Sequence, residues 1–233
     1  RRRQGLDDNG RRMAAAPARA ASARPAFHAA LVALAALRAR SGNDRRAVEL
    51  YGRALALCPG DTRTLHGMAL AQIGLGRADR ALAFLDRAIA IDDDDPDALT
   101  SRALVLAIFK RATPRALADS TAARTRRGKR GDAARVELAA AYAQLLAHRA
   151  KNCLSGVRRA RPKLDPERRP AYAQIVDTLE AACHLAARQM PAAKRINARL
   201  AKARKANTAI ARQLTLLWRR VLSDLQVRLR ALR

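Results

Sequence analysis

The sequence predicts an all-α protein, and three observations lead to this prediction. Hydrophobic residues make up 49% of the 233 residues, which is enough for a packed core and excludes a wholly disordered chain. Aromatic residues amount to only 3%, while Ala, Leu and Arg, which favour helices, are abundant. The third observation is an internal repeat whose apolar residues recur at helical spacing.

The repeat is clearest in residues 28–61 and 62–95, which align without gaps at a period of 34 residues. Each unit is predicted to form two helices separated by a glycine turn, at Gly42 and at Gly76. The small residues expected where the paired helices cross are Ala35, Ala47, Ala69 and Ala81. The large apolar residues expected around the first crossing are Leu31, Leu34, Tyr51 and Leu55. Because such a unit cannot bury its apolar face alone, the units must stack.

A third and more degenerate unit covers residues 97–131. Asp95 and Pro96 are predicted to begin its first helix, and Thr113 is predicted to cap the second helix with Pro114 in its first turn. The preceding acidic run, residues 92–95, lacks the alternating acids, the glycine and the distal Glu of a calcium loop. We therefore interpret the run as a solvated loop.

This pattern resembles the tetratricopeptide repeat family, whose signature the first unit carries as Leu31, Leu34-Ala35, Ala47, Tyr51, Ala54 and Pro59. The resemblance implies an α-solenoid of antiparallel helical hairpins. It also implies a non-catalytic scaffold or adaptor that binds a peptide, helix or partner protein in a concave groove. The first helix of each unit lines that groove in the family, which implies the groove residues Ala29, Val32, Ala36, Arg40, Arg63, His66, Leu70, Ile73, Ser101, Val105 and Ile108.

Beyond residue 124 the family pattern fades, although helical periodicity continues. Residues 132–233 are predicted to extend the solenoid as basic helical hairpins that begin at Asp132 and Asp165, with a break at Met190-Pro191. A long C-terminal helix over about residues 208–232 should bury its apolar stripe on the preceding hairpin. The domain prediction is thus a basic disordered or targeting-like tail over 1–27, a repeat array over 28–131 and this extension over 132–233.

The formal charge of +27 is unevenly distributed. Residues 28–96 hold nine basic and nine acidic side chains, whereas residues 125–233 hold 26 basic and seven acidic ones. Two clusters are candidate anion-binding sites: Arg126, Arg127, Lys129 and Arg130, and then Arg158, Arg159, Arg161 and Lys163. They support an alternative function as a nucleic-acid- or ribosome-associated helical repeat protein with RNA, DNA or an acidic protein as partner. Solvated arginine faces explain the same clusters equally well.

The sequence offers no catalytic, metal or cofactor motif, and His28, His66, His148 and His184 lie far apart. We therefore expect a protein that is not an enzyme, with a regulatory fragment of a larger enzyme as a second alternative. The three cysteines form no C-x-x-C pair and are interpreted as small buried hydrophobic residues in a reducing compartment. No apolar run approaches the roughly 20 residues of a membrane span. The predicted location is cytoplasmic, and the alternative is organelle targeting or export through the N-terminal segment.

Overall fold

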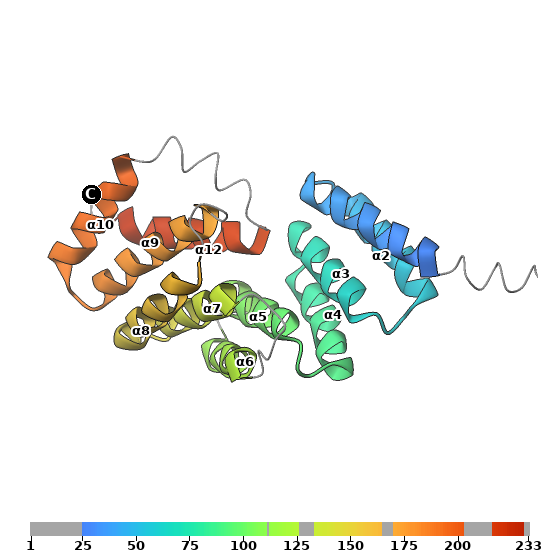
Figure 1. Cartoon of the computed structure of the whole chain (residues 1–233), viewed down its shortest axis with the longest axis horizontal. Helices are drawn as coiled ribbons and strands as arrows, with labels where there is room; N and C mark the ends of the chain where they lie inside the picture. The colour runs from blue at the N-terminus through green and yellow to red at the C-terminus, as the bar shows by residue number, and fades with distance from the viewer. Residues whose placement is uncertain (1–24, 111, 126–132, 165–169, 203–215, 231–233) are drawn as a thin grey trace, which may run out of the picture.

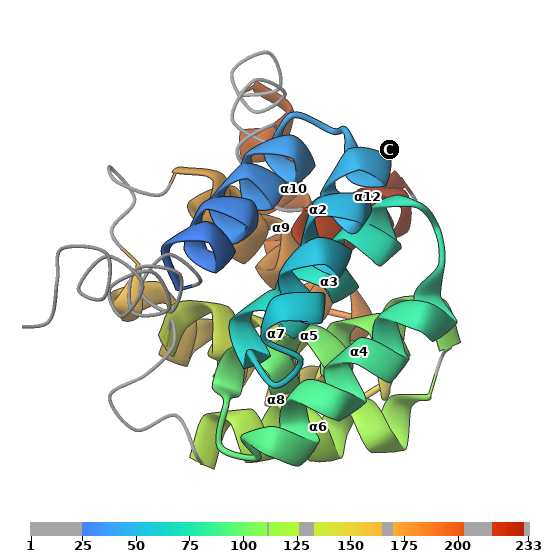
Figure 2. The ribbon, with the colours of Figure 1, turned by 90° about the vertical axis from the view of Figure 1, so that its right-hand side faces the viewer.

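The computed structural model describes residues 25–110, 112–125, 133–164, 170–202 and 216–230, and these are helical with no strand among them. The helices form antiparallel hairpins stacked side by side into a curved array (Figure 1; Figure 2), which confirms the predicted α-solenoid. A helix over residues 25–40 opens the array. The next five are α2 (Asp44–Leu57), α3 (Thr62–Gly74), α4 (Ala78–Ile91), α5 (Pro96–Val105), which continues as a π-helical turn (Leu106–Lys110), and α6 (Thr113–Thr125). The others are α7 (Ala133–Leu146), α8 (Ala150–Ala160) with a 3₁₀ turn (Arg161–Lys163), α9 (Pro170–Ala186), α10 (Met190–Lys202) and α12 (Leu216–Leu229).

The crossings of the first two hairpins lie at the predicted small residues. Ala35, Ala47, Ala69 and Ala81 have no exposed surface at all, so the helix backbones approach closely there. Leu31 and Tyr51 are buried around the first crossing, as expected. Leu34 is not: it lies on the outer side of the helix over residues 25–40 and remains exposed. The prediction for Leu34 is therefore wrong, because no described helix packs on this side of the first hairpin, whereas the equivalent Met68 is buried.

Four of the hairpin turns share one geometry. One residue in each turn, just after the first helix, has a positive φ, namely 81° at Gly42, 73° at Gly76, 58° at His148 and 59° at Arg188. In each turn the next amide donates to the carbonyl oxygen five residues earlier, as Asn43 does to Arg38 and Arg149 does to Gln144, both at 2.9 Å. The α7–α8 and α9–α10 hairpins therefore repeat the turn of the first two units without its glycine.

Several predicted element boundaries shift in the structure. Asp95 does cap α5, since its Oδ1 accepts hydrogen bonds from the amides of Asp97 (2.9 Å) and Ala98 (3.3 Å). Thr113, predicted to be a cap, is the first residue of α6. Met190 and Pro191 begin α10 instead of marking a break, because proline is well tolerated in the first turn of a helix. The predicted helix starts at Asp132 and Asp165, and residues 1–24, lie outside the described residues.

The sequence predicts that the C-terminal helix packs on the hairpin before it. In the structure this helix, α12, has further contacts as well. It contacts α9, and it also contacts α3 and α5 near the start of the array. Figure 1 shows α12 on the inner side of the curve, beside α9. Its stripe of Val221, Leu222, Leu225 and Leu229 is buried in the main hydrophobic core. This helix therefore connects the last described part of the chain to the second and third repeats.

Cys153 of α8 and Cys183 of α9 form a disulfide, with their Cα atoms 5.9 Å apart. The prediction of unpaired hydrophobic cysteines is therefore wrong for this pair, and Cys58 is a free but exposed thiol. The two paired cysteines are separated by 30 residues in sequence and meet only because α8 packs on α9. In the chain-entropy model, closing a loop of this length stabilises the fold by about 3–4 kcal/mol.

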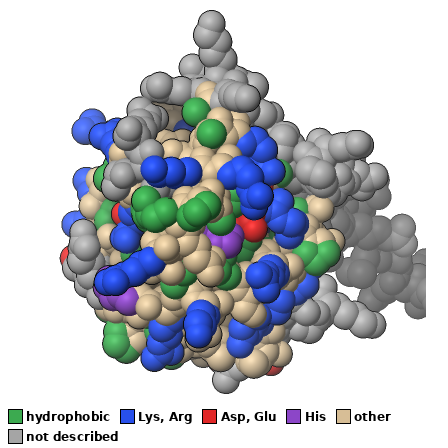
Figure 3. Space-filling model, turned by 90° about the vertical axis from the view of Figure 1, so that its left-hand side faces the viewer, with side chains coloured by type: hydrophobic (Ala, Val, Ile, Leu, Met, Phe, Trp, Pro, Cys, Tyr) green, Lys and Arg blue, Asp and Glu red, His purple; other side chains and the backbone are tan. Residues whose placement is uncertain are grey.

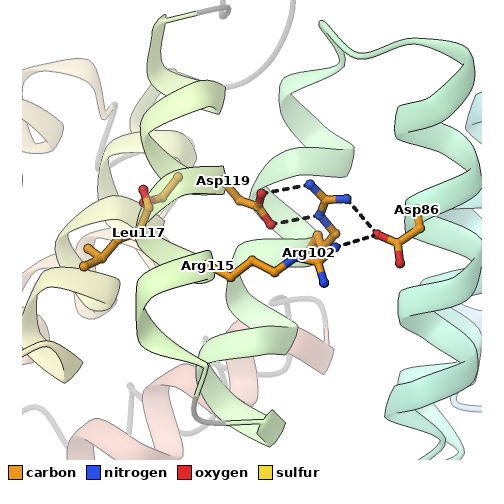
Figure 4. A network of polar contacts seen from close by, with 6 residues as sticks. Asp86, Arg102, Arg115, Leu117 and Asp119 are labelled. Carbon is orange, nitrogen blue, oxygen red and sulfur yellow. Dashed lines mark hydrogen bonds and ion pairs between the residues drawn. The ribbon is translucent and has the colours of Figure 1, made fainter.

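A network of ion pairs centred on Arg102 joins the second and third repeats (Figure 4). Arg102 of α5 donates two hydrogen bonds of 2.8 Å to the carboxylate of Asp119 on α6. It donates a third, of 2.7 Å, to Asp86 on α4, which also pairs with Arg115 at 3.4 Å. The bond to Asp119 is the main reason that the pKa of Arg102 lies above its ordinary value. This network holds three consecutive helices in register.

The second basic cluster is also used inside the fold. The buried carboxylate of Glu137 on α7 accepts hydrogen bonds from Arg159 (3.0 Å) and Lys163 (2.9 Å). Burial alone raises the pKa of Glu137, but hydrogen bonds and charges from Lys163 and Arg159 outweigh it, so this pKa lies below its ordinary value. Arg161 binds Asp177 (2.9 Å) and Glu180 (2.6 Å) on α9. Three of the four basic residues therefore join neighbouring helices.

The turn geometry predicts that His148→Gly stabilises the protein by about 1 kcal/mol, because a side chain is strained at positive φ. Urea unfolding followed by circular dichroism measures the change. The adjacent Ala147→Gly is the matched control and should lower stability, since Ala147 does not have a positive φ. A lower stability of both variants would show that the turn is not left-handed at His148.

The Glu137 network predicts that Arg159→Met together with Lys163→Met costs roughly 3 kcal/mol, because a buried carboxylate loses both partners. Arg158→Met is the control and should change stability little, as Arg158 is exposed.

Because the folded pKa of Glu137 is depressed, its stabilising contribution is present at neutral pH and is lost as the pH falls through that pKa. Unfolding curves between pH 7 and pH 3 should show this loss in the unmodified chain but not in the double variant. Identical pH dependence in both would contradict the network.

Candidate functional site

The predicted groove residues fall into two groups along the inner surface of the array. At the first end Val32, Ala36 and Leu70 are partly buried, while Arg40 and Arg63 are exposed. Ala29 is exposed beside them, and His66 is partly buried. These residues lie on the helix over residues 25–40 and on α3, and each keeps at least part of its surface exposed. We refer to Ala29, Val32, Ala36, Arg40, Arg63, His66 and Leu70 as the open groove.

At the other end the predicted groove is covered. Ile73, Ser101 and Val105 are buried, and Ile108 is partly buried against the main core. Ile73 and Val105 belong to the same buried cluster as Val221 and Leu225 of α12, and α12 contacts both α3 and α5. The C-terminal helix therefore occupies the inner surface where the sequence predicted free binding residues.

A cation–π contact and a hydrogen bond fix this helix further. The guanidinium of Arg220 on α12 lies 5.9 Å from the ring centroid of Phe109, which follows α5. Tyr142 on α7 donates a hydrogen bond of 3.0 Å from its hydroxyl to Asp224. The apolar stripe of α12 is visible in the sequence, but nothing in it says which surface the stripe covers.

Histidines hold the open groove together. His66 Nε2 lies 2.8 Å from Ser101 Oγ and thereby links α3 to α5. Burial lowers the pKa of His66 below its ordinary value, although the nearby carboxylates of Asp97 and Asp95 oppose the shift. At the first repeat, His28 Nε2 lies 3.6 Å from Asp61 Oδ2. His66 therefore joins the second repeat to the third, and His28, whose Nε2 also lies 3.4 Å from Thr64 Oγ1 on α3, joins the first repeat to the second.

Of the two candidate anion-binding clusters, only the second lies within the described residues, and most of it is paired with acids. Arg126, Arg127, Lys129 and Arg130 lie outside the described residues, and Arg159, Arg161 and Lys163 bind acidic side chains. Figure 3 shows Lys and Arg side chains spread over the end of the molecule near α8 and α10 instead of gathered in one patch. The described part of the chain contains no group of three His, Cys, Asp or Glu side chains that could hold a metal ion. None of its helices is long and apolar enough to cross a membrane.

Comparison with known proteins supports the repeat assignment. A family model described as tetratricopeptide repeat matches residues 38–105. No curated protein matches the sequence.

Solved structures match over most of the chain. One is a thermophilic tetratricopeptide-repeat protein of Thermus thermophilus, 19% identical with a TM-score of 0.61, which covers 88% of this chain and 98% of its own. Another is a putative kinesin light chain of Podospora anserina with nearly identical repeats, 14% identical with a TM-score of 0.60, at 76% and 95% coverage. A structure of MamA is 16% identical with a TM-score of 0.52, at 79% and 98% coverage. At these identities the likeness concerns the fold. Residues 38–105 therefore match the tetratricopeptide repeat model, and the described chain has the helical-repeat fold of tetratricopeptide repeat proteins.

Proposed function

We propose that the chain is a non-catalytic scaffold that binds a partner protein in the open groove. The observation that carries this proposal is the contrast along the inner surface. Val32 of the first repeat and Leu70 of the second are only partly buried, whereas Ile73 and Val105 are buried in the core cluster that includes α12. The repeat fold supports a protein-binding role, since stacked repeats expose extended concave surfaces.

The chemistry of the open groove favours an apolar segment with acidic residues at its side. Val32, Ala36 and Leu70 offer apolar contacts, and an amphipathic helix or extended peptide commonly uses such a surface. Arg40 and Arg63 are exposed at its edge and would attract carboxylates on the partner. The same surface would serve either a free scaffold or one that regulates a larger enzyme. A nucleic-acid partner has no comparable support, because the described basic cluster is largely paired with acids.

The disulfide bears on the cellular location of the scaffold. A bond between two fully buried cysteines, Cys153 and Cys183, persists in oxidising compartments and is rare in the cytosol. We therefore favour the alternative of organelle targeting or export over the cytoplasmic location.

The proposal predicts that Val32→Glu combined with Leu70→Glu abolishes capture of the partner by the immobilised chain, because two charges then occupy the apolar contact surface. Ala90→Glu on α4 is the control, since it adds charge at an exposed alanine on a different helix. Quantitative mass spectrometry of captured proteins and circular dichroism of each variant provide the measurements. A photo-crosslinker replacing Arg63 should join the same partner, and one replacing Ala90 should not. Capture of the same proteins by the double variant would contradict the proposal.

A further inference from the structure

The first repeat exposes positions that the following repeats bury. Leu34 is 40% exposed and Leu37 is 52% exposed. Their equivalents one repeat later are Met68, which is 5% exposed, and Ala71, which is fully buried. In the third unit Ala103 and Leu106 take the same places and are again buried. The difference lies in the neighbours, because the residue types at these positions are apolar in all three units.

The later repeats show what normally covers these positions. Met68 and Ala71 share a buried cluster with Leu50, Tyr51 and Ala54 of α2, and α2 packs on α3. In the same way α4 packs on α5. The second helix of each unit thus rests on this face of the next unit. The face of the first unit is the same interface without a described helix on it, and Figure 2 views the molecule from this end.

The exposed positions form one continuous surface. Phe27 and Leu34 are seven residues apart on one helix, and Leu37 follows three residues later, so the three share a stripe. Phe27 is 50% exposed, and the guanidinium of Arg53 on α2 lies 6.0 Å from its ring centroid. Arg38, four residues after Leu34, is exposed on the same side. We call Phe27, Leu34, Leu37, Arg38 and Arg53 the end surface.

The charge on this hairpin is positive. Residues 25–57 contain five arginines and two acids. Asp44 is buried, and Glu49 pairs with Arg46. Arg38 and Arg53 are therefore not balanced by the acids of their own hairpin. A partner helix with acidic side chains beside its apolar stripe would complement this surface in both shape and charge.

We propose that the end surface binds an amphipathic, acidic helix of a partner protein, in the place that the second helix of a preceding repeat would take. A second copy meeting through the same surface would bring Arg38 and Arg53 of both chains together, which like charges oppose. Residues 1–24 carry seven arginines against two acids, so like charges also oppose binding of this segment to the end surface. This site is separate from the open groove and does not depend on binding there.

The test uses two stapled, fluorescent peptides based on α4, the helix that occupies this interface on α5. One carries Arg80→Glu and Arg87→Glu and is acidic, and the other carries Asp79→Lys and Asp86→Lys and is basic. Fluorescence anisotropy with the full chain should show saturable binding of the acidic peptide. The affinity for the basic peptide should be lower by about tenfold or more. Leu34→Glu and Leu37→Glu should each weaken binding of the acidic peptide about tenfold or more.

Two controls separate this proposal from its alternatives. Ile91→Glu changes an equally exposed apolar residue elsewhere and should leave peptide binding unchanged. Val32→Glu with Leu70→Glu should also leave it unchanged, which distinguishes the end surface from the open groove. No binding by a chain whose circular dichroism is normal would overturn the proposal. So would a dimer in light scattering that Leu34→Glu dissociates, since the occupant would then be a second copy.

Discussion

The structure depends on one constraint, which is that no hairpin of the array can bury its apolar surface by itself. The alanines at the crossings, such as Ala35 and Ala81, are fully buried and let the paired helices approach closely. Larger side chains beside them, such as Leu65 and Leu85, are buried in a core cluster that continues into the next hairpins. Every further feature follows from how the array satisfies this requirement in its middle and at its ends. On the inner side α12 covers the apolar surface of α3 and α5. At the first repeat no described helix covers the exposed apolar face.

Electrostatic interactions reinforce the same stacking. A chain with a formal charge of +27 would be expected to repel itself, yet its acids are placed between helices. Arg102 joins α4, α5 and α6 through Asp86 and Asp119. Glu137 joins α7 to the end of α8 through Arg159 and Lys163. Some of the arginines that suggest an anionic partner, such as Arg102 and Arg159, therefore stabilise the contacts between helices.

The sequence was sufficient to predict the first half of the fold, because its signals are local. Gly42 and Gly76 mark turns that require a positive φ, and their spacing reveals the repeat directly. In the second half His148 and Arg188 adopt the same conformation, so the turns persist while the glycine signal disappears. The position of α12, the pairing of Cys153 with Cys183 and the covered state of Val105 depend on contacts between distant segments. Periodicity in the sequence does not report such contacts, so four of the eleven predicted groove residues were assigned to a partner although the chain itself covers them.

The central claim is that α12 covers the inner surface of α3 and α5 and leaves only the open groove free. Hydrogen–deuterium exchange of the full chain, compared with Leu225→Glu, tests it most directly. Leu225 is fully buried, so a charge there should detach α12 from the core. The account predicts faster amide exchange in α9, α3 and α5 and unchanged exchange in α2, which α12 does not cover. Unchanged exchange in α3 and α5, with α12 itself exchanging freely, would contradict it.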